Sequence, residues 1–198
     1  MVSAMDAMTA ARDHRATQPE VLLLLRAVDG DARAFAALTR MLARPALALA
    51  VRVLGDRALA EDAVQEAMTK LWREGRQFDP DRGSFAAWWH RVLMNCALDG
   101  RRRLKPVAPL DDAAHLPDDG VSAIEQAEAT SLAAHVQRAA AKLPARQRAA
   151  LALFYADGLS MAEIGDVLET SEKAVEGLLA RGREGLRPHL AGLQEELK

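Results

Sequence analysis

The stretch GLSMAEIGDVLETSEKAVEGLLARGREGL, residues 158–186, decides the fold of the C-terminal part of this chain. Ser160 and Glu163 form the sequence pattern of a capping box, which predicts that a helix starts directly after Ser160. This helix is predicted to end near Leu168, because Glu-Thr-Ser at 169–171 supplies a short turn and a new cap.

A second helix is predicted after this turn, since apolar residues recur there at spacings of three and four. They are Ala174, Val175, Leu178, Leu179 and Leu186. Two short helices around a tight turn make a helix-turn-helix, whose second helix fits the major groove of DNA. A packing hairpin without a DNA role is the alternative interpretation.

The rest of the chain also has helical periodicity, and the predicted fold class is all-α. Aromatic residues make up only 4% of the sequence, β-branched residues are sparse, and strand-like alternation is absent. Helices are expected at 57–74, with Asp56 as N-cap, and from Ser84, as N-cap, to about Leu104. The apolar stripes expected to face the core are Leu22, Leu25, Val28, Phe35, Leu38, Met41 and Leu42 in the first stretch and Val64, Met68, Leu71 and Trp72 in the second.

Charge divides the chain into four parts. Residues 1–19 are neutral and form a predicted N-terminal tail, whereas 20–105 carry 15 Lys and Arg against 11 acids. Residues 106–130 hold six acids and no Lys or Arg, with several prolines, which indicates a flexible acidic linker. Residues 131–198 balance nine basic against nine acidic side chains. We therefore expect two small helical domains joined by this linker.

Cysteine content and hydropathy limit the class of protein. A single cysteine, Cys96, excludes a disulfide framework and a cysteine-based zinc site, and we assign it to the core as inert. The apolar run 21–25 is far shorter than a membrane span. The expected location is the cytoplasm, without stable membrane insertion. The sequence holds no HExxH, no paired metal-ligand spacing and no glycine-rich phosphate loop, so we expect no enzyme, cofactor or metal site.

Four segments, taken in order and spacing, resemble those of the extracytoplasmic-function (ECF) type of bacterial sigma factor. They are GDARAFAAL at 30–38, AEDAVQE at 60–66 with Leu71-Trp72, GSFAAW at 83–88 with Asn95, ALD at 97–99 and the arginines 101–103, and LPARQR at 143–148 with GLSMAEI at 158–164 and RGREGLR at 181–187. Each segment alone is weak evidence for this resemblance, but the four together, in this order and spacing, are specific for the family. The resemblance covers about residues 20–105 and 131–187.

The resemblance implies three binding surfaces. The outer face of the 57–74 helix would dock on the β′ clamp helices of core RNA polymerase through Asp62, Gln65 and Glu66, which have no internal partner evident in the sequence. The 20–105 domain would read and help melt the −10 promoter element through Phe78, Asp79, Arg82, Trp88, Trp89, Arg91, Asn95, Arg101, Arg102 and Arg103. The 131–198 domain would read the −35 element, near the polymerase β flap, through Lys173, Glu176, Gly177, Ala180, Arg181 and Arg183.

Each of these segments also has a purely structural interpretation. The 57–74 face is also typical of a solvated helix surface, and loop 76–84 of an ordinary connection. Capping of a helix C-terminus explains one arginine of 101–103 but not three. By resemblance the loop captures a flipped base, and the acidic linker follows the RNA path of the core enzyme.

Three positions depart from the pattern of the resembled family: Trp89, Glu176, and Gly177, where Ser is commoner. Where ECF factors usually carry Leu after the first Trp, this chain has Trp89; exposed, it would stack on an unpaired base, and buried, it would replace Leu. Both alternatives stay open. At Glu176 a basic residue is commoner, and a carboxylate in the groove accepts a hydrogen bond from cytosine N4. We therefore predict that Glu176 reads a cytosine.

The function predicted from the sequence is that of a sigma factor, with an anti-sigma factor as an expected partner. Two rivals remain: a helix-turn-helix regulator that acts without the polymerase core, and a sigma mimic that titrates an anti-sigma factor without binding DNA. A pI of about 6.2 is low for a domain that grips duplex DNA unaided. The expected explanation is that the polymerase makes most phosphate contacts.

Overall fold

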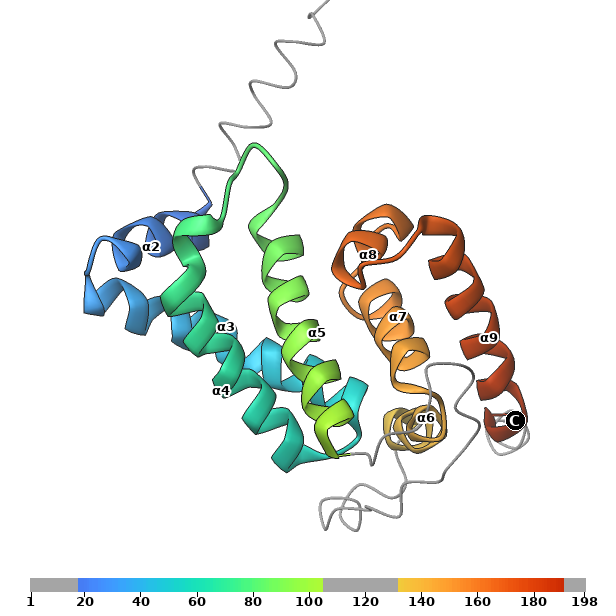
Figure 1. Cartoon of the computed structure of the whole chain (residues 1–198). Helices are drawn as coiled ribbons and strands as arrows, with labels where there is room; N and C mark the ends of the chain where they lie inside the picture. The colour runs from blue at the N-terminus through green and yellow to red at the C-terminus, as the bar shows by residue number, and fades with distance from the viewer. Residues whose placement is uncertain (1–17, 105–131, 191–198) are drawn as a thin grey trace, which may run out of the picture.

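The computed structural model describes residues 18–104 and 132–190, and every regular element within these ranges is a helix (Figure 1). The elements are α2 (Pro19–Val28), α3 (Ala32–Leu54), α4 (Arg57–Glu74), the short 3-10 helix η1 (Gly75–Gln77), α5 (Phe85–Leu104), α6 (Leu132–Ala141), α7 (Ala145–Tyr155), α8 (Met161–Val167) and α9 (Glu172–Leu190). The predicted all-α class is confirmed. The predicted linker, 106–130, and nearly all of the predicted tail lie outside the described residues.

The helix starts follow the local capping signals. The side chains of Asp56, Ser84 and Ser171 each accept a hydrogen bond from a backbone N–H three residues ahead, at 3.0 to 3.2 Å. In the predicted capping box, Ser160 Oγ accepts from the Glu163 N–H and Glu163 Oε2 accepts from the Ser160 N–H. These donors would otherwise be unpaired in the first turn of each helix.

Helices α2 and α3 bury a different set of residues from the predicted one. Val21 and Leu24 are buried on α2, whereas Leu22 and Leu25 are half exposed. On α3, Leu38 and Leu42 lie in the core as expected, but Met41 is 45% exposed. The prediction was wrong at Leu22, Leu25 and Met41. The run of adjacent apolar residues allowed more than one helical stripe, and packing between the helices selects the other.

Helix α4 packs against its neighbouring helices mainly through a row of alanines. Its buried residues are Ala60, Ala63, Ala67 and Leu71, and they pack against α3 and α5. Small side chains let helix axes approach closely, so the bulky residues beside the stripe are displaced outward. The assignment of Trp72 to the core is therefore wrong: its side chain is 46% exposed and meets Phe35 edge-on, with ring centroids 4.6 Å apart.

Helix α5 lies at the centre of the molecule, with α3 and α4 on one side and α7 and α8 on the other (Figure 1). It buries Phe85, Trp89, Leu93, Met94, Cys96 and Ala97. Burial raises the pKa of the Cys96 thiol, which keeps it protonated, and this agrees with its assignment to an inert core position. Helix α3 has the length and apolar composition of a membrane span; here it packs against α2, α4, α5, α6 and α7.

The predicted helix-turn-helix is formed by α8 and α9. The turn between them contains Glu169 at a φ of 50°, and the Thr170 N–H bonds to the Gly165 carbonyl at 2.9 Å. A Cβ on Gly165 would lie 2.9 Å from the Thr170 oxygen, so this close approach of the backbone requires glycine. Arg146 on α7 donates to the Leu168 carbonyl at 2.6 Å and closes the end of α8.

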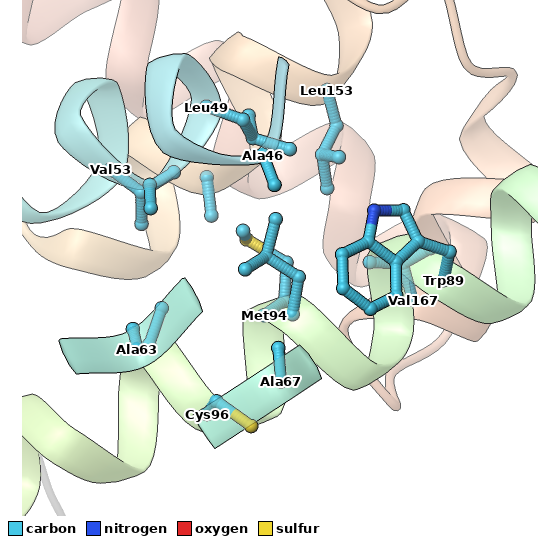
Figure 2. Close-up of a cluster of buried hydrophobic side chains, with 14 of the residues drawn as sticks. Ala46, Leu49, Val53, Ala63, Ala67, Trp89, Met94, Cys96, Leu153 and Val167 are labelled. Carbon is cyan, nitrogen blue, oxygen red and sulfur yellow. The ribbon is translucent and has the colours of Figure 1, made fainter. Parts of the chain in front are cut away.

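The two domains share one continuous core. Buried residues of α3, α4 and α5 and buried residues of α7 and α8 belong to the same cluster, which includes Trp89, Met94, Leu153 and Val167 (Figure 2). Helix α3 packs against α6 and α7, and α5 packs against α7 and α8. The C-terminal domain thus packs against both α3 and α5 of the N-terminal domain.

Arg148 on α7 is the buried charge at this junction, with 2% of its surface exposed. Its guanidinium donates to the Ala141 carbonyl at 2.7 Å and to the Leu54 carbonyl at 3.2 Å. These carbonyls belong to the last residues of α6 and α3, where the helix dipoles are negative. A cation is thus neutralised by two helix ends from different domains.

Replacing Arg148 by Met is expected to lower the free energy of unfolding by about 1.5–3 kcal/mol, because the buried Leu54 carbonyl and the partly buried Ala141 carbonyl each lose a charged donor. Urea denaturation followed by circular dichroism measures this loss. Arg138→Met on exposed α6 surface is the matched control and should change stability by less than about 0.5 kcal/mol. Equal stability of the two variants would contradict the role given to Arg148.

Candidate nucleic-acid and polymerase interface

The outer face of α4 presents two of its three predicted residues freely. Asp62 and Gln65 are exposed, but Glu66 is partly buried and has internal partners. Its Oε1 lies 3.7 Å from Lys70 Nζ and 3.5 Å from Arg103 Nη2. The expectation that Glu66 lacks an internal partner was wrong. Asp62 and Gln65 remain as the open polar pair.

The loop between η1 and α5 is anchored by Phe78. This side chain is buried and packs against Phe85 and Trp88, with ring centroids 5.6 and 5.7 Å away. The ring of Phe78 is therefore mostly taken up by this aromatic cluster, and only a small part of it lines the adjacent cavity, so its role as a DNA contact stays a prediction. The exposed Asp79 shapes the loop, since its Oδ1 accepts from the Asp81 N–H at 2.9 Å.

A cavity of about 440 Å³ lies between this loop, α5 and α8. It is lined by Gln77, Phe78, Asp79, Arg82, Gly83, Ser84, Ala87, Trp88, Arg91, Glu163 and Asp166. Five predicted −10 residues, from the loop and α5, thus line one space. Two carboxylates on the opposite wall come from the C-terminal domain, which sequence reasoning did not anticipate.

The two adjacent tryptophans have different surroundings. Trp88 is half buried and faces the cavity, whereas Trp89 is 4% exposed and lies in the core. Of the two alternatives for Trp89, the structure shows the buried one, in which it fills a core position. The prediction that Trp89 contacts DNA directly is therefore corrected, because the buried indole has no free face in this conformation.

Arg91 and Asn95 lie one turn apart on α5, as expected. Arg91 is exposed, but Asn95 is partly buried and its Nδ2 donates to Glu169 Oε1 at 3.1 Å. Five residues before Asn95, His90 Nε2 lies 2.9 Å from Asp157 Oδ2. Both carboxylates belong to the C-terminal domain. Pairs this far apart in sequence leave no local signal, which is why sequence reasoning missed His90, Asp157 and Glu169.

Each arginine of 101–103 has a partner within the chain. Arg101 reaches the Leu54 carbonyl at 3.5 Å, Arg102 lies 3.6 Å from Asp99, and Arg103 contacts Glu66. Arg101 and Arg103 thus have tertiary partners, and Arg102 pairs within its own helix, so internal contacts add to helix capping as reasons for this run of arginines. Arg102 and Arg103 remain exposed enough to reach a phosphate.

Helix α9 presents its predicted residues to solvent. Those that are exposed are Lys173, Glu176, Ala180, Arg181 and Arg183. Gly177 is partly buried, and the Arg181 guanidinium lies over it: a Cβ at Gly177 would be 3.6 Å from both terminal nitrogens. Arg183 Nε donates to the Leu179 carbonyl one turn back at 3.1 Å. These predicted positions hold three cations and one carboxylate, and Glu172 and Glu184 are exposed on the same helix.

Family comparisons assign the two domains separately. Residues 38–106 match sigma-70 region 2, and residues 134–186 match sigma-70 region 4. With both regions in one chain, and with the ECF sigma factors described next matching it over most of their length, the chain belongs to the ECF group of the sigma-70 family. Region 2 thus includes most of α3, with α4 and α5, and region 4 the helix-turn-helix.

Relatives and solved structures agree with this assignment. The chain is 32% identical to the ECF RNA polymerase sigma factor SigW of Bacillus subtilis, over 83% of this chain and 92% of SigW. It is 36% identical to the ECF RNA polymerase sigma factor SigM of Mycobacterium tuberculosis, over 83% and 81%. The structure of CnrH in complex with the cytosolic domain of CnrY matches with a TM-score of 0.61 and 28% identity, over 88% of this chain and 99% of that one.

A second solved structure supports the fold. It is the sigma factor RpoE in complex with the anti-sigma factor NepR from Bartonella quintana, with a TM-score of 0.59 and 20% identity over 79% of this chain and 96% of that one. Within residues 18–104 and 132–190, no group of three or more His, Cys, Asp or Glu side chains is placed to hold a metal ion.

The contrast between the tryptophans predicts a difference in stability. Trp89→Ala should lower the free energy of unfolding by about 3–5 kcal/mol, because it empties a buried site. Trp72→Ala should cost only about 1 kcal/mol, since it loses one edge-on contact on the surface. Urea denaturation of both variants measures the difference, and similar losses would contradict the burial of Trp89.

Proposed function

We propose that this ECF sigma factor binds core RNA polymerase, recognises the −35 and −10 promoter elements with separate domains, and promotes melting of the duplex. The observation that carries the proposal is the pairing of an exposed, cation-rich α9 in a helix-turn-helix with an open polar face on α4 in the same chain. The proposed domain bounds are 20–105 and 131–198, joined by the acidic linker.

The proposed −10 surface is the cavity and its rim. Arg82 and Arg91 would contact the DNA backbone, and Trp88 and Asp79 line the space that would receive an unpaired base. Arg102 and Arg103 would extend the positive surface along the end of α5. Asn95 and Arg101 join this surface only if their internal contacts open. Trp89 supports it from the core.

The polymerase is proposed to perform the covalent chemistry and to supply most phosphate contacts, so that the chain itself acts without a cofactor. The proposed location is the cytoplasm, with the polymerase. An anti-sigma factor is the proposed regulator, supported by the RpoE–NepR complex, which has the same fold. The β′ clamp helices and the β flap are the proposed docking sites on the core.

The experiment that tests the proposal is run-off transcription with sigma-free bacterial core polymerase, the purified chain and a library of random promoters. Transcripts that share a −35 and −10 pair are expected. Duplex binding without core polymerase, and no transcripts, would favour the helix-turn-helix regulator. Absence of both, with capture by an anti-sigma factor, would favour the titrating mimic.

The α4 face gives the first variant test. Asp62→Ala combined with Gln65→Ala should weaken binding to core polymerase by about tenfold or more, because both side chains would be central to a small polar contact. Glu74→Ala, an exposed acid on a different face of α4, is the control. Fluorescence anisotropy of the labelled chain titrated with core measures the affinities, and equal affinities would exclude this face.

The domain proposed to read the −35 element gives the second variant test. Glu176→Ala should remove the preference for cytosine at one −35 position, a discrimination of about 1–3 kcal/mol, because the hydrogen bond to cytosine N4 is lost. Glu184→Ala, two turns further along α9, should keep it. Sequencing of transcripts from the promoter library measures the base frequencies; an unchanged preference in the Glu176 variant would refute the assignment.

A further inference from the structure

The short helix η1, which leads into the loop proposed to read the −10 element, packs closely against the end of α2. Gly75, its first residue, is buried, and a Cβ placed there would lie 2.7 Å from Leu24 Cδ1 and 3.1 Å from Val28 Cγ1. The backbone at Gly75 has an ordinary helical φ of −57°, so its conformation would accept any residue. Glycine is needed here because α2 lies so near.

A polar contact joins the same two elements. Arg76 Nη2 donates to the Val28 carbonyl and lies 3.4 Å from Asp29 Oδ1. Val28 is the last residue of α2, so its carbonyl has no acceptor role inside the helix and lies at the negative end of the helix dipole. Both partners of the ion pair are mostly exposed, which makes the bond to the carbonyl the stronger of the two contacts. Arg76 thus caps α2 from the loop side.

The turn that carries these acceptors is itself held in place. The Asp31 carboxylate accepts from the Arg26 guanidinium at 2.7 and 3.2 Å and from the backbone N–H groups of Arg33 and Ala34. One side chain therefore joins the last turn of α2 to the first turn of α3. Helix α2 packs against both α3 and η1, and it precedes the residues that match sigma-70 region 2 (Figure 1).

Beyond η1 the loop has a second anchor and then an exposed part. Phe78 packs against Phe85 and Trp88, as described above. Asp79 and Arg82 follow it, are exposed and line the cavity of about 440 Å³. The direction in which the chain leaves η1 therefore decides where these two charged side chains lie relative to the cavity.

We propose that the C-terminal turn of α2 supports the −10-reading loop, and that Arg76 is a positioning residue for base selection, acting through Asp79 and Arg82. This inference rests on the proposed function, because it takes the loop as part of the −10 surface. A loop already held in its binding geometry loses less conformational freedom when it captures a base, and poor placement of its side chains weakens discrimination. The end of α2 thus affects −10 selectivity without touching DNA.

The polar contact is tested with Arg76→Ala in the run-off assay with core polymerase and the random promoter library. At the most selective −10 position, the ratio of the most to the least frequent base should fall by about threefold or more, as expected for a residue that acts on a site without touching its ligand. The −35 base frequencies should stay unchanged. Arg76→Lys keeps a donor for the Val28 carbonyl and should recover part of the selectivity. Arg44→Ala, which removes an exposed arginine of α3, is the charge-matched control and should change neither element.

The close packing is tested with Gly75→Ala. The added methyl group should displace η1 from Leu24 and lower −10 selectivity in the same way as Arg76→Ala. Gly100→Ala on α5 is the matched control, because a Cβ there meets no atom within 4 Å. Circular dichroism and the affinity for core polymerase, measured by fluorescence anisotropy, show whether each variant remains folded.

The outcomes separate this inference from the proposed function. If the wild type transcribes and both Arg76→Ala and Gly75→Ala keep its −10 base frequencies, the positioning role is overturned. Equal loss of selectivity at the −10 and −35 elements also overturns it, because a general loss of stability then explains the effect. Absence of transcripts from the wild-type chain overturns the proposed function instead.

Discussion

The arrangement of the two domains depends on the buried guanidinium of Arg148. A charge at that depth needs acceptors, and the two terminal nitrogens of Arg148 find them in the last carbonyls of α6 and α3, while its Nε is buried without a hydrogen-bond partner among the described residues. Both helix ends must therefore stop at the right place. Gly55 and Asp56 ensure this for α3, since Gly55 takes a φ of 75° and Asp56 caps the next helix. A local turn signal in one domain thus fixes where the other can dock.

Local signals were predictable from the sequence, and helix faces were less so. Caps at Asp56, Ser84, Ser160 and Ser171 involve atoms three residues apart, so the pattern contains the whole interaction. The buried face of α2 involves a choice between neighbouring apolar residues that only the partner helix can make. On α4 the bulky side chain of Trp72 suggested burial, but the alanines beside it permit the closer packing and take the inner positions.

The candidate site divides in the same way. The exposed residues of α9 were predictable, because a helix-turn-helix fixes which face of its second helix is free. The contact of Asn95 with Glu169 and that of Glu66 with Arg103 were not predictable, because these partners are far apart in the sequence, although Lys70 one turn after Glu66 was a local signal that could have been used. The burial of Phe78 depends on how the loop folds back onto Phe85 and Trp88. A side chain whose chemistry suits DNA suits an internal acceptor equally well, so residue type alone cannot distinguish the two.

The acidic contacts bear on the low pI as well. A net charge of −2 favours only weak non-specific binding to duplex DNA, yet the surface proposed to read the −10 element contains Arg82 and Arg91, whose charges attract phosphates. Glu163 and Asp166 of α8 line the same cavity as Arg82 and Arg91, so acids of one domain lower the electrostatic potential at arginines of the other. A low overall charge and a basic surface on the N-terminal domain are compatible, because charge is unevenly distributed along the chain: residues 20–105 carry 15 Lys and Arg against 11 acids.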